Sequence, residues 1–286
     1  MDQVEKTVLG IDLGGSGART IAVKQNGTSL EPQASISSEF DCRELSSTEL
    51  KKTLTVQIET LMKKVPNVEG IGISVPAMLQ KDGTIKSERF KALEQFETTL
   101  ADFIEKVSGK PCRAKIDSES GAEAEASFGS GKCFERFAYF TLGSGVGGAT
   151  VEKGKAENRS FGYIAVNDRD IVEELANAAW VRSQTTGQID ARALHLLATA
   201  QDINAKNIFF NLGYSLGCAA VTVNNIWKPD AIVFGGNISL AFEHILPGIL
   251  QSLSVIKRHP SAKFPALVAA KFGGKSSLYG AAILAL

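Results

Sequence analysis

Residues 8–23, VLGIDLGGSGARTIAV, join two apolar runs through a turn that contains three glycines. The first run carries a single acidic residue, Asp12, and the second resumes at Thr20. Apolar, β-rich runs on both sides of a glycine turn predict a strand, a tight turn and a returning strand. The other motifs of the chain are interpreted in relation to this hairpin.

The turn itself consists of Gly14, Gly15, Ser16 and Gly17. Glycine lacks a Cβ and accepts positive φ, so successive N–H groups in such a turn can converge on a phosphate. Asp12 ends the first strand, where its carboxylate can hold Mg²⁺ through water. This stretch alone leaves an ordinary glycine-rich hairpin open as the alternative. A Walker loop and a dinucleotide fold are excluded, because no Gly-Lys-Ser/Thr follows and the returning segment resembles a strand rather than a helix.

The composition argues against a nucleic-acid-binding, membrane or secreted protein. A chain of 286 residues suits two domains, and its 31 basic residues equal its 31 acidic ones, which favours neither a nucleic-acid partner nor an acidic membrane surface. The polar N-terminus does not resemble a signal peptide, and no window approaches the apolar length of a membrane span. The four cysteines are far apart, which predicts reduced thiols in a cytoplasmic protein rather than a zinc cluster or a disulfide framework.

Helices and strands alternate along the chain. Apolar residues at helical spacing predict helices within residues 46–64, 90–107, 118–128, 171–182, 190–200, 205–227 and 276–286. Apolar runs bounded by turn signals predict further strands at residues 68–75, 112–116, 137–142, 149–151 and 231–234. The alternation predicts an α/β fold with mixed sheets flanked by helices.

A second glycine turn, residues 143–148, repeats the organisation of residues 8–23. Two such units predict a duplicated domain whose turns face each other across a cleft and clamp a polyphosphate. Gly235, Gly236 and Asn237 follow a later strand, where the backbone could accept an adenine or a ribose. A plain turn between a strand and a helix is the alternative for these three residues.

Asp117 lies between a predicted strand and a predicted helix. A carboxylate at such a junction can be exposed in a cleft and yet held rigidly, as a catalytic base requires. Capping of the helix by Asp117 or Ser118 is the structural alternative.

In the order of these motifs the sequence resembles the ROK family of sugar kinases, within the actin-like ATPase and sugar kinase superfamily, over nearly the whole chain. The matching segments are residues 10–17 and 142–148 for the two phosphate motifs, 232–236 for the adenosine motif and 278–282 for the closing helix. The motif Gly-Gly-Ser-Gly at residues 14–17 and the spacing of residues around Asn158 are most similar to those of the polyphosphate glucokinase branch. The resemblance implies two actin-like, ribonuclease H-like domains with a cleft between them: residues 1–117 with a returning helix at 276–286, and residues 118–275.

The resemblance also implies a function. It predicts a kinase that transfers a phosphoryl group from ATP or polyphosphate, with Mg²⁺, to a hydroxyl of a hexose or sugar-like substrate, and it makes Asp117 the general base. The implied donor-binding residues are Asp12, Gly14, Gly15, Ser16, Gly17, Gly143, Ser144, Gly145, Gly147, Gly235, Gly236 and Asn237. The implied sugar-binding residues are Pro76, Arg89, Asn158, Ser160 and Tyr163. Dimers are common among such enzymes, so a homodimer is one alternative, and the sequence leaves the oligomeric state open.

Several positions depart from the family pattern. The usual Asn-Asp pair is Ile116-Asp117, and the usual Glu-x-Gly-His is Ser160-Phe-Gly-Tyr163. The histidine and cysteine cluster that binds zinc in many members is absent, so no zinc site is expected. A site built from hydrogen bonds selects strongly for its ligand, so these losses predict an altered substrate rather than ordinary glucose.

A substrate with an acidic group that contacts Arg89 or Arg159 is one hypothesis. A second class of function is a degenerate member that binds a nucleotide or sugar without turnover; the intact phosphate turns and Asp117 favour the kinase over it. A repressor with an N-terminal helix-turn-helix domain is disfavoured, because the first predicted strand begins within about ten residues of Met1.

Overall fold

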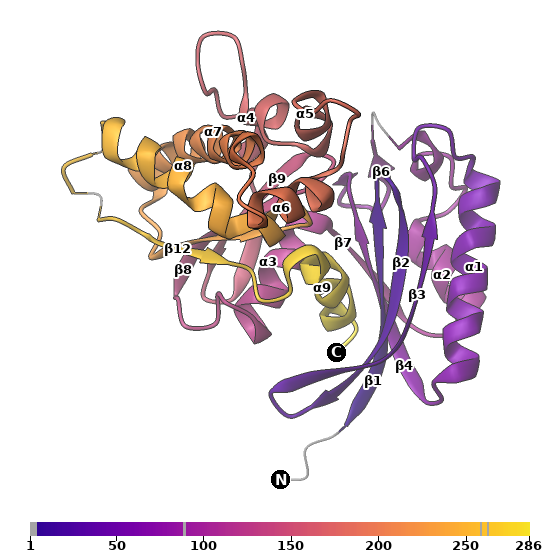
Figure 1. The fold of residues 1–286 in the computed structure, drawn as a ribbon. Coiled ribbons are helices and arrows are strands. Elements are labelled where there is room, and N and C mark those ends of the chain that lie inside the picture. The colour runs from indigo at the N-terminus through magenta and orange to yellow at the C-terminus, as the bar shows by residue number, and fades with distance from the viewer. Residues whose placement is uncertain (1–4, 88–89, 258, 262) are drawn as a thin grey trace. The chain divides into compact units, whose positions relative to one another are not determined.

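The structure is a computed structural model that describes residues 5–87, 90–257, 259–261 and 263–286. The chain divides into two compact units, Met1–Ala124 with Ser277–Leu286, and Glu125–Ser276 (Figure 1). This division falls within helix α3 (Asp117–Phe128), whereas the sequence placed the boundary at the start of that helix.

The first unit is built on a five-stranded sheet with the order β3-β2-β1-β4-β7. Its strands are β1 (Lys6–Gly14), β2 (Gly17–Asn26), β3 (Ser29–Glu39), β4 (Val68–Val75) and β7 (Cys112–Ile116). β1 is antiparallel to β2, while β1, β4 and β7 are parallel to one another. The carboxyl ends of these three parallel strands therefore share one edge of the sheet. A separate small hairpin contains β5 (Met78–Leu79) and β6 (Ile85–Lys86).

Helices cover both faces of this sheet. One face carries α1 (Ser47–Lys64), α2 (Leu100–Ser108) and the short η1 (Lys91–Leu93), and the other carries α9 (Ser276–Leu284) (Figure 1). Ser46 and Glu49 form the capping box that starts α1, and Gly109, with a φ of 67°, ends α2. Both helices overlap the ranges that the apolar spacing predicted.

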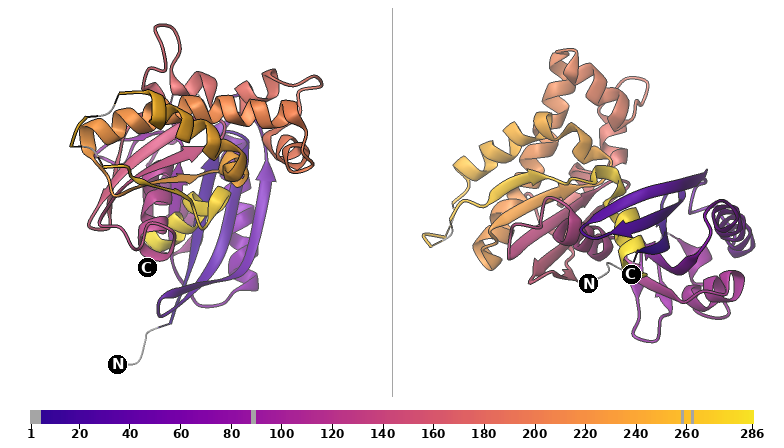
Figure 2. Two further views of the ribbon diagram at one scale, coloured as in Figure 1. Left: turned by 60° about the vertical axis from the view of Figure 1, so that its left-hand side comes forward. Right: turned by 90° about the horizontal axis from the view of Figure 1, so that it is seen from below.

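The C-terminal helix α9 packs unusually close to the sheet of the first unit (Figure 2). A Cβ added at Gly72 of β4 would lie 1.9 Å from the carbonyl oxygen of Ala281, and one added at Gly10 of β1 would lie 2.5 Å from that of Leu278. No side chain fits at these two positions, so glycine allows the backbones of helix and sheet to touch.

The second unit repeats this topology. Its sheet has the order β10-β9-β8-β11-β12. The strands are β8 (Arg136–Leu142), β9 (Val146–Glu152), β10 (Lys155–Asn158), β11 (Ala231–Gly235) and β12 (Ala266–Ala269). β8, β9 and β10 form an antiparallel meander, and β11 and β12 add to β8 in parallel. The internal repeat that the two glycine turns predicted is confirmed.

The helices of the second unit form its core with one face of that sheet. They are η2 (Phe161–Tyr163), α4 (Val172–Leu175), α5 (Ala178–Ser183), α6 (Ala191–Thr199), α7 (Ile203–Trp227), η3 (Ile238–Ala241), α8 (Phe242–Val255) and η4 (Gly273–Lys275). Phe140 and Phe234 of the sheet pack in one cluster with Phe209 of α7. The single helix predicted at 171–182 is wrong: Asn177 accepts a hydrogen bond from the N–H of Trp180 and so caps a separate helix, α5.

One segment, Ile238–Val255, corrects the expectation that no stretch is long and apolar enough to cross a membrane. It meets that test by length and composition, and 44% of it is buried inside the protein. The apolar residues have a structural explanation, because α8 lies directly on α7. A Cβ added at Gly213 would lie 2.1 Å from the carbonyl oxygen of Ile245, and one at Gly248 would lie 2.0 Å from that of Phe210. Core helices of this kind pass the same test, so the segment is weak evidence for a span.

Candidate functional site

The first glycine turn has two residues at its tip, Gly15 and Ser16, between Gly14 and Gly17, which pair with each other at the ends of β1 and β2. The N–H of Cys42 donates a hydrogen bond of 3.0 Å to the carbonyl of Gly15, which fixes the turn. Within the described part of the chain, the N–H groups of the two tip residues donate no hydrogen bond to protein atoms. They are therefore available to bind an anion.

Asp12 is a buried acid at the end of β1, with 5% of its surface exposed. It lies opposite Arg19 across the hairpin, and the Nε of Arg19 donates a hydrogen bond of 3.2 Å to its Oδ2, which also accepts one from Nη2. Burial raises the pKa of Asp12, and the charge and hydrogen bonds of Arg19 oppose that rise. Ser74 of β4 is in register with Asp12; its hydroxyl lowers the same pKa but forms no hydrogen bond of regular geometry.

Sequence patterns did not single out Arg19, although the hairpin contains the signal for it. A two-residue turn between paired Gly14 and Gly17 fixes the register of the two strands. Counting outward from that pair places Arg19 directly opposite Asp12. The cation that opposes the rise in the pKa of Asp12 could therefore be predicted from the turn length.

The variant Arg19→Met is expected to lower the free energy of unfolding, and to lower it more at neutral than at acid pH. The folded pKa of Asp12 is raised, so ionising Asp12 destabilises the fold as the pH rises above the unfolded pKa of about 4. Without Arg19 that pKa rises further. We expect the free energy of unfolding to fall by about 2 kcal/mol at pH 7. This lies between the values typical of surface ion pairs and of buried ion pairs, because the Arg19 side chain is 37% exposed.

Urea unfolding at pH 4 and pH 7.5 measures this difference. The double variant with Asp12→Asn is the control, since it should remove the pH-dependent part of the loss. A loss of equal size at both pH values in Arg19→Met would contradict the assignment.

Asp117 begins α3 directly after β7, and its side chain is half-buried. Its Oδ1 accepts a hydrogen bond of 2.7 Å from the N–H of the next residue, Ser118. A capping side chain accepts from an N–H two or three residues further on, so this bond differs from the capping geometry considered above. Because β1, β4 and β7 are parallel, Asp117 and Asp12 lie at the same edge of the sheet, with β4 between their strands. Pro76 follows β4 at this edge.

Arg89, the remaining predicted sugar-binding residue of the first unit, lies outside the described residues.

The second glycine turn connects β8 and β9 in the second unit. The N–H of Gly143 donates a hydrogen bond of 2.9 Å to the carbonyl of Gly145, and its own carbonyl accepts one of 2.8 Å from Ala178. Ser144 is exposed at the tip, and Gly147 is half-buried in β9. Apart from its two chain neighbours, no described residue has an atom within 4 Å of the position that a Cβ of Gly143 would take, so there is open space beside the turn.

Glu173 of α4 holds this turn, although no sequence signal pointed to it. Its Oε2 accepts a hydrogen bond of 2.5 Å from the N–H of Val146. A Cβ added at Gly145 would lie 2.7 Å from Oε1, and one added at Gly162 would lie 2.9 Å from Oε2. The carboxylate thus touches both the second glycine turn and η2.

Gly235, Gly236 and Asn237 lie beside the second turn, because β11 pairs in parallel with β8. Gly236 has a φ of 85°, and a Cβ there would lie 2.2 Å from the carbonyl oxygen of Leu142. Its N–H donates a hydrogen bond of 3.1 Å to Gly273, and the exposed Asn237 is next in the chain. The structure therefore brings the predicted adenosine and second phosphate motifs together at one edge of the sheet.

The predicted sugar-binding residues of the second unit lie on and after β10. Asn158 ends that strand half-buried, Ser160 is exposed, and Tyr163 is 72% exposed. The Nη1 of Arg159 donates a hydrogen bond of 2.6 Å to Glu157, and the two form an ion pair. Because Glu157 already pairs with Arg159, the geometry counts against Arg159 as a contact for an acidic substrate.

The ROK family model matches residues 8–165 and 171–286. The protein belongs to the ROK family. A glucokinase of Halalkalibacterium halodurans is 23% identical over 282 residues, which cover 86% of this chain and 85% of that protein. A ROK glucokinase of Streptomyces griseus, solved with glucose and AMPPNP, has a TM-score of 0.82 and 20% identity over 98% of this chain and 99% of its own.

The fold is shared with ROK proteins of another kind. A ROK transcriptional regulator, homologous to the E. coli MLC protein, has a TM-score of 0.80 and 21% identity over 99% of this chain and 78% of its own. The predicted α/β fold of two actin-like units is confirmed by these structures and by the two mixed sheets. The fold is therefore common to ROK enzymes and regulators, and the function has to be argued from the site.

Proposed function

We propose that this ROK protein is a carbohydrate kinase that phosphorylates a hydroxyl of a sugar or sugar-like substrate, with Asp117 as the general base. The observation that carries this proposal is the position of Asp117. It is partly exposed, held by the N–H of Ser118, and shares a sheet edge with the first glycine turn and Asp12. The family relationship to a glucokinase adds support.

In the proposed reaction, the carboxylate of Asp117 accepts the proton of the substrate hydroxyl while that oxygen attacks the terminal phosphorus of the donor. The free N–H groups of Gly15 and Ser16 stabilise negative charge on phosphoryl oxygens. In the second unit we assign further donor contacts to the second turn, where the space beside Gly143 is open, and to the exposed Asn237, which follows the neighbouring strand β11.

The surroundings of Asp12 fit a Mg²⁺ ion that is bound through a water molecule rather than directly by the carboxylate. Asp12 is an oxygen ligand of the kind that Mg²⁺ prefers, and Arg19 favours its ionised form. Its 5% exposure and its bonds to Arg19 do not fit direct coordination. We therefore assign Asp12 to an indirect contact; when bound, the ion supplies neutralisation of phosphate charge.

The donor is a nucleotide or polyphosphate in this proposal. The S. griseus glucokinase was solved with AMPPNP, which supports a nucleotide. The acceptor is expected to differ from glucose, because Ile116, Ser160 and Tyr163 replace polar residues of the family pattern. Each replacement changes or removes a hydrogen-bonding group that would select a particular sugar hydroxyl.

A protein that binds nucleotide or sugar without turnover is the second candidate. Two observations favour it: the exposed side chain of Tyr163 at a position where the family has a sugar-contacting histidine, and the shared fold of a ROK regulator. The position of Asp117 favours the kinase, because a pure sensor needs no base at this edge.

A panel of hexoses, amino sugars, uronic acids and polyols, each incubated with Mg²⁺ and either ATP or polyphosphate, distinguishes the two functions. Mass spectrometry of the products should show one phosphorylated acceptor. If no acceptor reacts while Mg²⁺–ATP raises the melting temperature, the protein binds without turnover. If neither product nor a shift is seen with either donor, both functions are rejected.

A further inference from the structure

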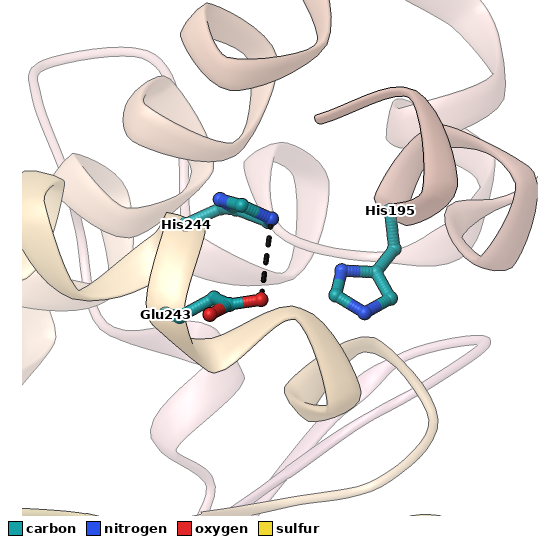
Figure 3. Close-up of side chains that lie close together, drawn as sticks. All are labelled: His195, Glu243 and His244. Carbon is teal, nitrogen blue, oxygen red and sulfur yellow. Dashed lines mark ion pairs between the residues drawn. The ribbon is translucent and has the colours of Figure 1, made fainter. Parts of the chain in front are cut away.

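Three side chains that can bind metal ions lie together on two helices of the second unit. His195 comes from α6, and Glu243 and His244 come from the first turn of α8 (Figure 3). One potential ligand atom from each residue lies within 4.8 Å of the other two. The whole chain has three histidines, and two of them meet here. This group is separate from the glycine turns and from Asp117.

One buried nitrogen of this group has no hydrogen-bond partner among the described residues. The Nε2 of His244 is 3.5 Å from Oε1 of Glu243, and the two imidazole rings are 5.4 Å apart between centroids. The Nδ1 of His195 is buried and, among the described residues, has no hydrogen-bond partner. A buried polar atom without a partner costs free energy, and a bound metal ion would remove that cost.

The charges near this group act on a cation in opposite directions. The carboxylate of Glu243 attracts a cation, and Lys206 of α7, whose charge reaches His244, repels one. Glu243 is 67% exposed, so one side of the group remains open to water.

We propose that His195, Glu243 and His244 bind a divalent transition-metal ion of the zinc class and thereby tie α6 to α8. Two imidazole nitrogens and one carboxylate oxygen are ligands that zinc accepts, with water in the fourth position. Tetrahedral bonds of about 2.0–2.2 Å place ligand atoms about 3.4 Å apart, close to the 3.5 Å between Glu243 and His244. Small side-chain rotations would bring His195 from within 4.8 Å to that distance.

This site differs from the zinc cluster of many ROK proteins, whose residues the sequence lacks. The expectation of no zinc site concerned only that cluster. The ligand set also separates the site from the proposed magnesium contact, because Mg²⁺ prefers oxygen ligands and would not select two imidazoles. The inference therefore does not depend on the proposed kinase function.

Binding of Zn²⁺ and Co²⁺ to the full-length, tag-free protein tests this proposal. We expect one equivalent of Zn²⁺ to bind at pH 7.5 and to raise the melting temperature, and Mg²⁺ to do neither. The variants His195→Gln and His244→Gln should lose at least about 100-fold in affinity, the upper end of the loss seen when only an outer-shell partner is removed. His259→Gln is the matched control, because His259 lies outside the group and its Nδ1 contacts Ser261. It should bind as the wild type does.

The visible spectrum of the Co²⁺ complex identifies the ligands. Bands of a four-coordinate nitrogen and oxygen site that disappear in His195→Gln would support the proposal. Thiolate charge-transfer bands that persist in both histidine variants would assign the metal to the exposed Cys133 and overturn it. Circular dichroism of each variant shows whether it is folded, and absence of Zn²⁺ binding by the folded wild type would also overturn the proposal.

Discussion

The variant Asp117→Asn is expected to lower kcat for phosphoryl transfer by about 10²- to 10⁴-fold, the range that a general base contributes. Asparagine keeps the shape of the side chain, and its amide oxygen can still accept the hydrogen bond from Ser118. It cannot take a proton from the substrate hydroxyl. The KM for the acceptor and the melting temperature should therefore change little, and steady-state kinetics with circular dichroism measure both.

Asp168→Asn is the matched control for this variant, because Asp168 has an 87% exposed side chain and no part in the proposed site. It should keep the wild-type kcat. An equal loss of activity in both variants, or a loss in Asp117→Asn that accompanies unfolding, would remove the evidence for a base at this position.

The variant Gly72→Ala is expected to cause a large loss of stability in the first unit. The new Cβ would lie 1.9 Å from the carbonyl oxygen of Ala281 and 3.0 Å from the Cβ of Leu284. The first of these contacts is with backbone, so rotation of a side chain cannot relieve it. Either α9 or β4 must shift, and we expect a loss of about 3 kcal/mol or more, the upper end for overpacking.

Gly70→Ala on the same strand is the control, because it adds the same methyl group with a milder steric clash. Its Cβ would lie 3.2 Å from the carbonyl oxygen of Ala285, so a shift of a few tenths of an ångström is enough. We expect a loss of about 1 kcal/mol for this variant. Chemical denaturation of both proteins gives the comparison, and equal losses would mean that α9 does not constrain the sheet as described.

Local signals explain why part of the structure could be predicted from the sequence. Ser46 and Glu49 are three residues apart before an apolar periodic segment, and they form the capping box that starts α1. The glycines of residues 14–17 lie between two apolar runs and form the predicted hairpin turn. Asp117 follows a short apolar strand and begins a helix, so its place in the fold was also predictable.

Other features depend on tertiary packing and could not be predicted. β3 is mostly polar and exposed on alternate residues, and it becomes a strand because β2 offers it an edge. Glu173 is one of many acidic residues in the sequence, and only its hydrogen bond to Val146 distinguishes it. The group of His195, Glu243 and His244 joins residues nearly fifty positions apart in the chain, which no local pattern reveals.

The most direct test of the central claim is the amount of phosphorylated acceptor that the wild type and Asp117→Asn form side by side, with the same donor and Mg²⁺. The proposed function predicts a product that the wild type forms only with its acceptor and that falls by about 10²-fold or more in the variant. It also predicts that both proteins gain the same melting-temperature shift with Mg²⁺–ATP, since the donor contacts are unchanged. Product formed by Asp117→Asn at the wild-type rate would contradict the claim that Asp117 is the base.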